Sequence, residues 1–221
     1  MLYIVPTPLG NLKDISERAK ETLQACDFII AENPATTHKL LQLLNLPKKE
    51  VVQFADHNEN KVLDKYIARL STESAALVSD AGTPGISDPG FKLVRACREQ
   101  GIEIFAIPGP SAAVTALSAS GLPTDRYLFV GFLSKTEFKV NELVELAKNS
   151  GATLVAYESP QRIIKTLGFL EKSAPEAKAV VARELTKLHE EYLLGTPAEL
   201  KSQLEAKPSI KGEITLLISF K

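Results

Sequence analysis

Glycine and proline are concentrated in one segment of the chain, residues 79–90, which lies between an apolar run and a helical pattern. Its twelve residues include three glycines and two prolines, together with Asp80 and Asp88. Glycine allows tight turns and positive φ, so backbone N–H and C=O groups can approach a ligand without an intervening side chain. We interpret this 79–90 loop as a ligand cradle built from backbone. A long turn stabilised by its aspartates is the alternative.

A second turn, Pro108-Gly109-Pro110-Ser111, also precedes a helical pattern. Ser111 can cap that helix, and the helix N-terminus would then offer N–H groups suited to a carboxylate or a phosphate. The simpler interpretation is that Ser111 is an N-cap and has no further role.

Other polar groups follow apolar runs in the same way. They lie at residues 6–11, 32–34 and 56–59 in the first half and at residues 157–162 and 182–187 in the second. Such groups could surround a ligand. Each group in the second half also has a structural explanation, because Arg183 and Glu184 can form an ion pair and Ser159-Pro160 can start a helix.

Several common site signatures are missing from the sequence. No G-x-G-x-x-G follows the first apolar run and no G-x-x-x-x-G-K-[ST] occurs, so neither NAD nor ATP is favoured. The histidines show no H-x-x-x-H spacing and the cysteines no C-x-x-C spacing, so no metal site is expected. Ser111 is not part of a G-x-S-x-G pattern, which argues against a hydrolase.

The elements that would position these groups alternate between short strands and amphipathic helices. Apolar runs predict strands at residues 2–5, 28–31, 51–54, 75–79 and 102–107, with helical patterns between them. This succession predicts a mostly parallel sheet flanked by helices. Because ligands bind beyond the carboxyl ends of parallel strands, the polar groups of the first half should surround one crevice.

The regular alternation changes after a Gly-Leu-Pro-Thr-Asp turn at residues 121–125. The strands predicted beyond it, at residues 127–133, 153–157, 178–182 and 213–219, are separated by longer connections. Glycine and proline end the preceding helix at this turn. We therefore predict two α/β domains, residues 1–120 and residues 121–221.

Composition limits the class of protein. The 221 residues are 44% hydrophobic and 24% charged, which excludes a disordered chain, and the net charge of -1 provides no global attraction for nucleic acid. Apolar runs are far shorter than the roughly 20 residues that cross a bilayer, and no basic segment precedes the first one. We expect a cytoplasmic protein whose two cysteines, Cys26 and Cys97, are reduced core thiols.

Seven blocks of the sequence, in this order, resemble the tetrapyrrole methylase superfamily. They lie at residues 3–15, 56–59, 79–90, 108–113, 157–159, 183–187 and 211–213. The 79–90 block is the most specific of them. Within the superfamily, the resemblance is closest to the bacterial enzymes that methylate the 2′-hydroxyl of a cytidine in the 16S ribosomal RNA of the small subunit.

The resemblance implies two α/β domains, the second with a mixed sheet, and a homodimer. It also implies S-adenosylmethionine as cofactor in a cleft between the domains. The residues that it places at the cofactor are Pro8, Leu9, Gly10, Asp80, Ala81, Gly82, Thr83, Pro84, Ser111, Ala112, Tyr157, Glu158, Ala182, Arg183, Glu184, Leu185, Gly212 and Glu213.

Methyl transfer to a ribose hydroxyl requires positioning of that hydroxyl and removal of its proton, and it needs no metal. A carboxylate could take the proton, and a cation could stabilise the developing negative charge. Our candidates are Glu32, Glu158 and Lys187, which all lie at the ends of predicted strands. A single-stranded or loop RNA is the favoured target.

Two other functions fit the same sequence. The chain could methylate a small molecule or a protein, or it could bind the cofactor without turnover. One departure from the family bears on this choice: residues 33–35 read Asn-Pro-Ala, where members usually have Asp-Thr-Arg. The loss of an acidic and a basic residue, together with a chain that stops soon after the last strand, predicts weaker RNA binding.

Overall fold

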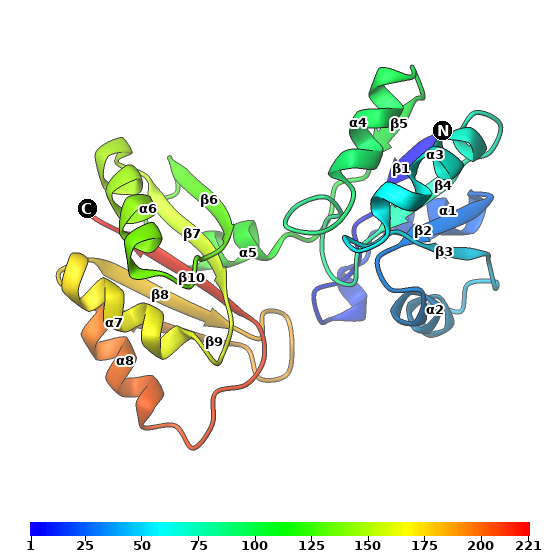
Figure 1. The fold of residues 1–221 in the computed structure, drawn as a ribbon. Helices are drawn as coiled ribbons and strands as arrows, with labels where there is room; N and C mark the ends of the chain where they lie inside the picture. Colours follow the sequence, from blue (N-terminus) through cyan, green and yellow to red (C-terminus); the bar gives the residue numbers. More distant parts are fainter. The chain divides into compact units, whose positions relative to one another are not determined.

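The computed structural model describes all 221 residues and divides into two compact units, Met1–Ser111 and Ala112–Lys221 (Figure 1). Each unit consists of one five-stranded sheet with helices packed on both faces. The predicted two-part α/β fold, with a parallel sheet followed by a mixed one, is confirmed.

The sheet of the first unit is entirely parallel. Its strands are β1 (Leu2–Ile4), β2 (Phe28–Ala31), β3 (Val51–Gln53), β4 (Ala75–Val78) and β5 (Ile104–Ala106), and their order is β3-β2-β4-β1-β5. Every residue of β2 and β4 is buried. Strands covered on both faces are apolar throughout, which is why their runs stand out in the sequence.

Four α-helices cover the two faces of this sheet. Helices α1 (Glu17–Ala25) and α2 (Pro34–Leu43) pack on one face, and α3 (Glu59–Leu70) and α4 (Phe91–Glu99) pack on the other. A short 3₁₀ helix, Leu12–Asp14, precedes α1. Cys26 lies in the core beneath the first pair of helices and Cys97 in the core beneath the second, and both thiols are free.

The sheet of the second unit is mixed. Its strands are β6 (Tyr127–Phe132), β7 (Thr153–Glu158), β8 (Lys178–Arg183), β9 (Glu191–Gly195) and β10 (Ile214–Ser219), in the order β6-β7-β10-β8-β9. Only β6 and β7 pair in parallel. Strand β9 was not predicted from the sequence.

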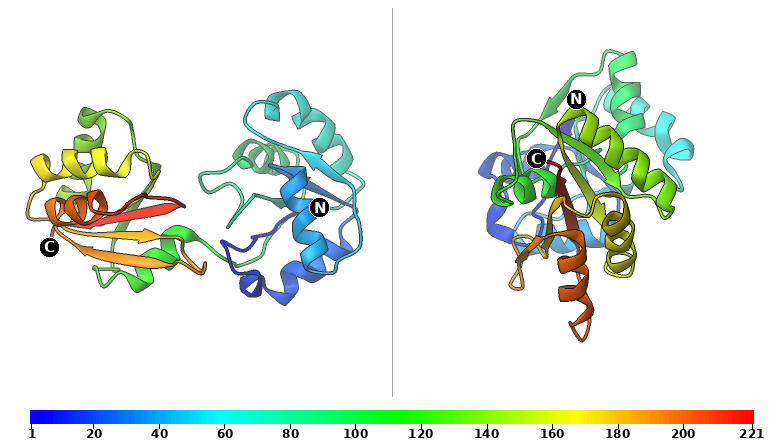
Figure 2. Two further views of the ribbon diagram at one scale, coloured as in Figure 1. Left: turned by 90° about the horizontal axis from the view of Figure 1, so that it is seen from below. Right: turned by 90° about the vertical axis from the view of Figure 1, so that its left-hand side faces the viewer.

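Helices α6 (Glu137–Ser150), α7 (Ile163–Ser173) and α8 (Pro197–Glu205) cover one face of the second sheet, and α5 (Ala112–Ala119) covers the other (Figure 2). The core against α5 includes Ala116, Val155 and Val180. None of the helices combines the length and the apolarity needed to cross a membrane.

The division between the units differs from the predicted one. The sequence places it between residues 120 and 121, whereas the structure places it between Ser111 and Ala112. The difference is helix α5, whose buried residues Ala113, Ala116 and Leu117 pack on the second sheet. A glycine-proline turn marks where a helix ends, but it does not show on which sheet the helix packs.

Candidate active site

The loops after β1 and β4 are joined by an isolated β-bridge between Thr7 and Gly82. The Thr7 N–H donates to the Gly82 carbonyl at 2.9 Å, and the Gly82 N–H donates to the Thr7 carbonyl at 3.1 Å. The buried Thr7 hydroxyl also donates to the Ser79 carbonyl at 3.2 Å. Two loops that are far apart in the sequence are thereby held as one surface at the carboxyl ends of the strands.

The loop after β5 joins the same surface. The Thr83 hydroxyl donates to the Pro110 carbonyl at 2.9 Å. A Cβ placed on Gly109 would lie 2.5 Å from the Cβ of Pro6, and one on Gly82 would lie 3.3 Å from a methyl of Leu9. The close approach of these loops therefore requires glycine at position 109.

The 79–90 loop has the backbone conformation that its glycines predict. Gly82, Gly85 and Gly90 have φ of 88°, 80° and 140°, a region that side chains disfavour. Ser87 also has a positive φ, at 63°. Strained non-glycine residues of this kind are common at ligand-binding sites.

Several acidic residues lie near one another in the loops after β2, β3 and β4, where the charges of Asp80 and Asp56 act on Glu32 and the charges of Glu32, Asp80 and Asp56 act on Asp88. Burial raises the pKa of Glu32, and the charges of Asp80 and Asp56 raise it further against a hydrogen bond from the Asp80 backbone. Burial also raises the pKa of Asp80, although a hydrogen bond from Thr36 opposes the shift.

Asp88 is the most strongly perturbed member of this acidic group. Burial, with repulsion from Glu32, Asp80 and Asp56, raises its pKa to about 6, although a hydrogen bond from Ser79 opposes the shift. Carboxyl groups with raised pKa values can take up a proton near neutral pH, which suits general base chemistry. Neither Asp88 nor Asp56 was predicted as a site residue, although both lie in segments whose polar residues follow predicted strands.

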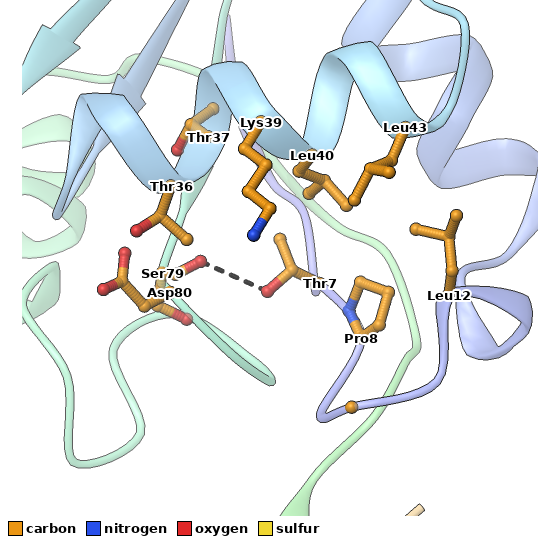
Figure 3. A pocket seen from close by; sticks show the side chains of 11 residues that line it. Thr7, Pro8, Leu12, Thr36, Thr37, Lys39, Leu40, Leu43, Ser79 and Asp80 are labelled. Carbon is orange, nitrogen blue, oxygen red and sulfur yellow. Dashed lines mark hydrogen bonds between the residues drawn. The ribbon is translucent and has the colours of Figure 1, made fainter. Parts of the chain in front are cut away.

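A pocket of about 200 Å³ opens between α2 and the loops after β1 and β4 (Figure 3). Its lining divides into a polar part and an apolar part. The polar residues are Thr7, Thr36, Thr37, Lys39, Ser79 and Asp80, and the others are Pro8, Gly10, Leu12, Leu40 and Leu43. The pocket thus includes the predicted residues Pro8, Gly10 and Asp80, and it adds a wall from α2 that the sequence did not indicate.

In the second unit, three predicted residues form one ion-paired group. Glu184 accepts hydrogen bonds from the Lys187 amine at 2.9 Å and from the Glu213 N–H at 3.0 Å, and Lys187 also donates to the Glu213 carboxylate at 2.8 Å. Gly212 has a φ of 90°, which favours glycine, and a Cβ at this position would also force the Glu184 carboxylate to move. Glu184 itself has a φ of 53°, another strained position.

Lys187 remains charged in this arrangement. Its partial burial disfavours the charge, but the hydrogen bonds to Glu213 and Glu184 outweigh that cost and raise the pKa of Lys187. A lysine held in this way can stabilise negative charge but does not accept a proton at neutral pH.

Residues 1–201 match the family model described as Tetrapyrrole (Corrin/Porphyrin) Methylases. The chain belongs to the tetrapyrrole methylase family. It matches curated methyltransferases of this family over nearly its full length. The protein is therefore a methyltransferase.

Those relatives carry the name Ribosomal RNA small subunit methyltransferase I. The protein of Hydrogenobaculum sp. is 41% identical over 99% of this chain and 95% of its own length. The protein of Thermotoga maritima is 39% identical over 100% and 98%, and that of Vibrio cholerae is 46% identical over 99% and 76%.

Solved tetrapyrrole methylase folds align with the whole chain. A diphthine synthase superposes with a TM-score of 0.78 at 16% identity, covering 99% of this chain and 89% of the other. The cobalt precorrin-4 methyltransferase CbiF superposes with a TM-score of 0.70 at 18% identity, covering 99% and 94%. At such identities the likeness establishes the fold alone.

Within the second unit of this methylase, the side chain of Glu158 lies apart from Tyr157, Ala182 and Leu185. Tyr157 and Ala182 pair with the same residue of β10, Thr215, and belong to the α5 side of the sheet together with Leu185. Alternation along β7 directs Glu158 to the opposite side. There its carboxylate accepts hydrogen bonds from the Ser159 N–H and the Thr166 hydroxyl, both at 2.7 Å.

Arg162 completes the partners of Glu158. Its guanidinium lies 2.5 Å from the carboxylate, whose side chain is 0% exposed, and it also donates to the Leu133 carbonyl. A carboxylate that is buried with both oxygens bonded positions its surroundings and is poorly placed to take a proton from a substrate. Of the two predicted carboxylates, Glu32 is the more accessible, because it is partly exposed whereas Glu158 is buried.

Three further predicted residues have clear positions. Arg183 pairs with Glu191 at 3.1 Å and donates to the Lys211 carbonyl, so it stabilises the chain beside Gly212. Ser111 ends the first unit, directly after Pro110, which accepts the hydrogen bond from Thr83. Ala112 begins α5 in the second unit.

Proposed function

We propose that this methyltransferase transfers the methyl group of S-adenosylmethionine to the 2′-hydroxyl of a cytidine in 16S ribosomal RNA. The observation that carries the proposal is the 41% identity, over 99% of this chain, with a relative named Ribosomal RNA small subunit methyltransferase I. The proposal includes a cytoplasmic location, where small subunits assemble, and a homodimer.

The loops of the first unit fit S-adenosylmethionine. The joined loops present backbone and small side chains, and a Cβ on Gly82 would fill part of the space beside Leu9 and the Pro110 carbonyl. Carboxylates and carbonyl oxygens suit a sulfonium cation on electrostatic grounds. In the proposal, Asp80 to Pro84 and Ser111 contact the methionine part.

The proposal assigns the adenosine part of the cofactor to residues of the second unit. Tyr157, Ala182 and Leu185 share one side of the sheet, and the glycine at position 212 leaves the backbone open beside Glu184. Ion pairing of Lys187 with Glu184 and Glu213 keeps this segment in one conformation. Preorganised groups of this kind lower the cost of binding.

When bound, S-adenosylmethionine supplies a methyl group on a positively charged sulfur. The residues of the chain must hold the ribose hydroxyl in line with that methyl and receive its proton. Glu32 is proposed to accept the proton, because burial and its acidic neighbours raise its pKa above the ordinary value of a glutamate. The Glu32 carboxylate would thereby receive the proton of the ribose hydroxyl, whose oxygen would take the methyl group from the cofactor's sulfur.

A transfer assay tests the proposal. The protein is incubated with tritiated S-adenosylmethionine and, in parallel, with small ribosomal subunits, free ribosomal RNA, a protein extract and a small-molecule extract. We expect label in RNA, in a dinucleotide that resists alkaline cleavage. Label in protein or in a small molecule would contradict the RNA substrate, and cofactor binding without transfer to any fraction would contradict turnover.

Variants connect the activity to the site. Glu32→Gln should reduce transfer strongly while the affinity for S-adenosylmethionine, measured by calorimetry, stays the same. Glu21→Gln, an exposed substitution on α1, is the matched control and should be fully active. Normal turnover by Glu32→Gln would remove Glu32 from the mechanism. Light scattering checks the homodimer.

A further inference from the structure

The pocket beside α2 has an unpaired cation at its edge. Lys39 lies on the exposed side of α2, and it forms no hydrogen bond or ion pair in the structure. Figure 3 shows its amine directed into the pocket, between the hydroxyl-bearing residues and the leucines. Most other charged groups near the carboxyl ends of these strands are acidic, so Lys39 is the basic group that an anionic ligand would meet in this pocket.

The opposite part of the pocket is apolar and open. Leu40 and Leu43 from α2 face Leu12 and Pro8 across the pocket (Figure 3). Leu43 is 54% exposed, although it stands at the end of a helix whose Leu41 is buried. A surface of this kind suits a flat, weakly polar group, such as a nucleobase.

The polar part leads toward the acidic group. Asp80 lines the pocket and receives a hydrogen bond from Thr36, and the charge of Asp80 influences both Glu32 and Asp88. A matching ligand would therefore have three parts. An apolar ring would lie against the leucines, an anionic group would pair with Lys39, and a hydroxyl would face the carboxylate of Asp80. A nucleotide within an RNA strand has these three parts.

We propose that this pocket binds one nucleotide of the RNA strand, with a phosphate on Lys39 and the base against Leu40 and Leu43. This inference rests on the proposed function, because it assumes that RNA is the substrate. It assigns RNA contact to the side of α2 that carries Lys39, Leu40 and Leu43.

Two variants have different expected signatures. For a single strand, the affinity falls with salt, and each phosphate contact contributes about 0.7 to the steepness of log affinity against log salt concentration. Lys39→Ala should therefore make this dependence less steep by about 0.7. It should also weaken RNA binding several-fold at low salt. Leu43→Ala removes an apolar contact, so it should weaken binding at every salt concentration and leave the slope unchanged.

The chain offers a matched control for each variant. Lys65→Ala removes an exposed lysine from α3, and Leu146→Ala removes a leucine of α6 that is 54% exposed, as Leu43 is. The probe is a fluorescein-labelled single-stranded RNA that contains the cytidine methylated in the transfer assay. Anisotropy titrations give the affinity, circular dichroism confirms folding, and calorimetry gives the affinity for S-adenosylmethionine.

The outcomes separate this inference from the proposed function. A lower salt slope for Lys39→Ala, with normal cofactor affinity and unaffected controls, supports the inference. If the wild-type protein methylates RNA but Lys39→Ala keeps the wild-type slope and affinity, the inference is overturned and the function stands. Weaker cofactor binding by Lys39→Ala would also overturn it, because the amine would then serve the cofactor. If the wild-type protein methylates no RNA, the proposed function fails and the inference fails with it.

Discussion

Asp88 couples the ionisation of the site to the stability of the fold. A carboxyl whose pKa is raised to about 6 binds its proton more tightly in the folded protein than in the unfolded chain. The free energy of unfolding should therefore decrease as the pH rises from about 4 to about 6. Above this range the folded protein carries the full cost of the buried charge, and below it the cost is absent.

The variant Asp88→Asn should remove this cost. We expect it to be more stable than the wild-type protein at pH 8 by about 1–2 kcal/mol, a figure reduced for the partial exposure of the side chain. The difference should vanish below about pH 4. Urea denaturation at a series of pH values measures it, with Asp64→Asn on the exposed side of α3 as control. Equal stability at pH 8 would show that the charge of Asp88 is not costly.

Glu158 illustrates a residue whose role is structural. Glu158→Gln leaves the Arg162 guanidinium partly buried without its counter-charge, so it should lower the free energy of unfolding by about 3 kcal/mol. Glu171→Gln, which breaks the more exposed pair with Lys201, should cost less than about 1 kcal/mol. Thermal denaturation compares the two. Similar losses in both variants would contradict a special role for the buried pair.

The roles of single residues were only partly predictable from the sequence. Gly82, Gly85 and Gly90 have the positive φ that their spacing indicates. Glu158 was selected as catalytic because it ends a strand, but its position in the sequence does not reveal that its carboxylate is buried and bonded to Thr166 and Arg162. Lys39 was not selected, because a lysine in an amphipathic helix looks like ordinary solvent-exposed charge until the fold brings it beside the loops after β1 and β4.

At the level of elements, the close packing of the loops after β1 and β5 depends on Gly109. Gly109→Ala would place a Cβ 2.5 Å from that of Pro6, and the proline ring gives the backbone little freedom to move. We expect a loss of about 2 kcal/mol or more in the free energy of unfolding, in the range of overpacked sites. S-adenosylmethionine affinity should also fall, because the joined loops would separate.

Gly168→Ala is the matched control for this prediction. Gly168 lies inside α7, and nothing would lie within 4 Å of its new Cβ. Because alanine favours a helix interior over glycine, this variant should be more stable by about 0.5–1 kcal/mol. Urea denaturation of both variants should give shifts of opposite sign. Destabilisation by both, or by neither, would contradict the packing argument.

Strands buried on both faces were the easiest elements to predict. Residues 28–31 form β2 with the predicted bounds, because all four side chains are buried and apolar. Strand β9 was missed because Glu191–Gly195 is a half-buried edge strand whose apolar run is short and shows no regular alternation. Edge strands take part of their stability from pairing, and pairing partners are not visible in a local pattern.

For the whole molecule, the position of α5 determines where the chain can be divided. The second unit buries Val155, Val180 and Leu217 against α5. A fragment of residues 112–221 should therefore fold cooperatively, whereas residues 121–221 would expose this core face. Thermal denaturation of the two fragments, followed by circular dichroism, tests this expectation. A cooperative unfolding transition is expected only for the fragment of residues 112–221. A cooperative transition of equal midpoint in both would contradict the assignment of α5 to the second unit.

The two free cysteines give the first unit a pair of natural reporters. Burial raises the pKa of the Cys97 thiol to about 11 and also raises that of Cys26, so both stay protonated and unreactive while the unit is closed. The second unit contains no cysteine. Pulsed alkylation at increasing urea concentrations, with mass spectrometry of the two cysteine peptides, would therefore follow two regions of one sheet without any engineered label. Cys26 reports the opening of the face covered by α1 and α2, and Cys97 reports the opening of the face covered by α3 and α4.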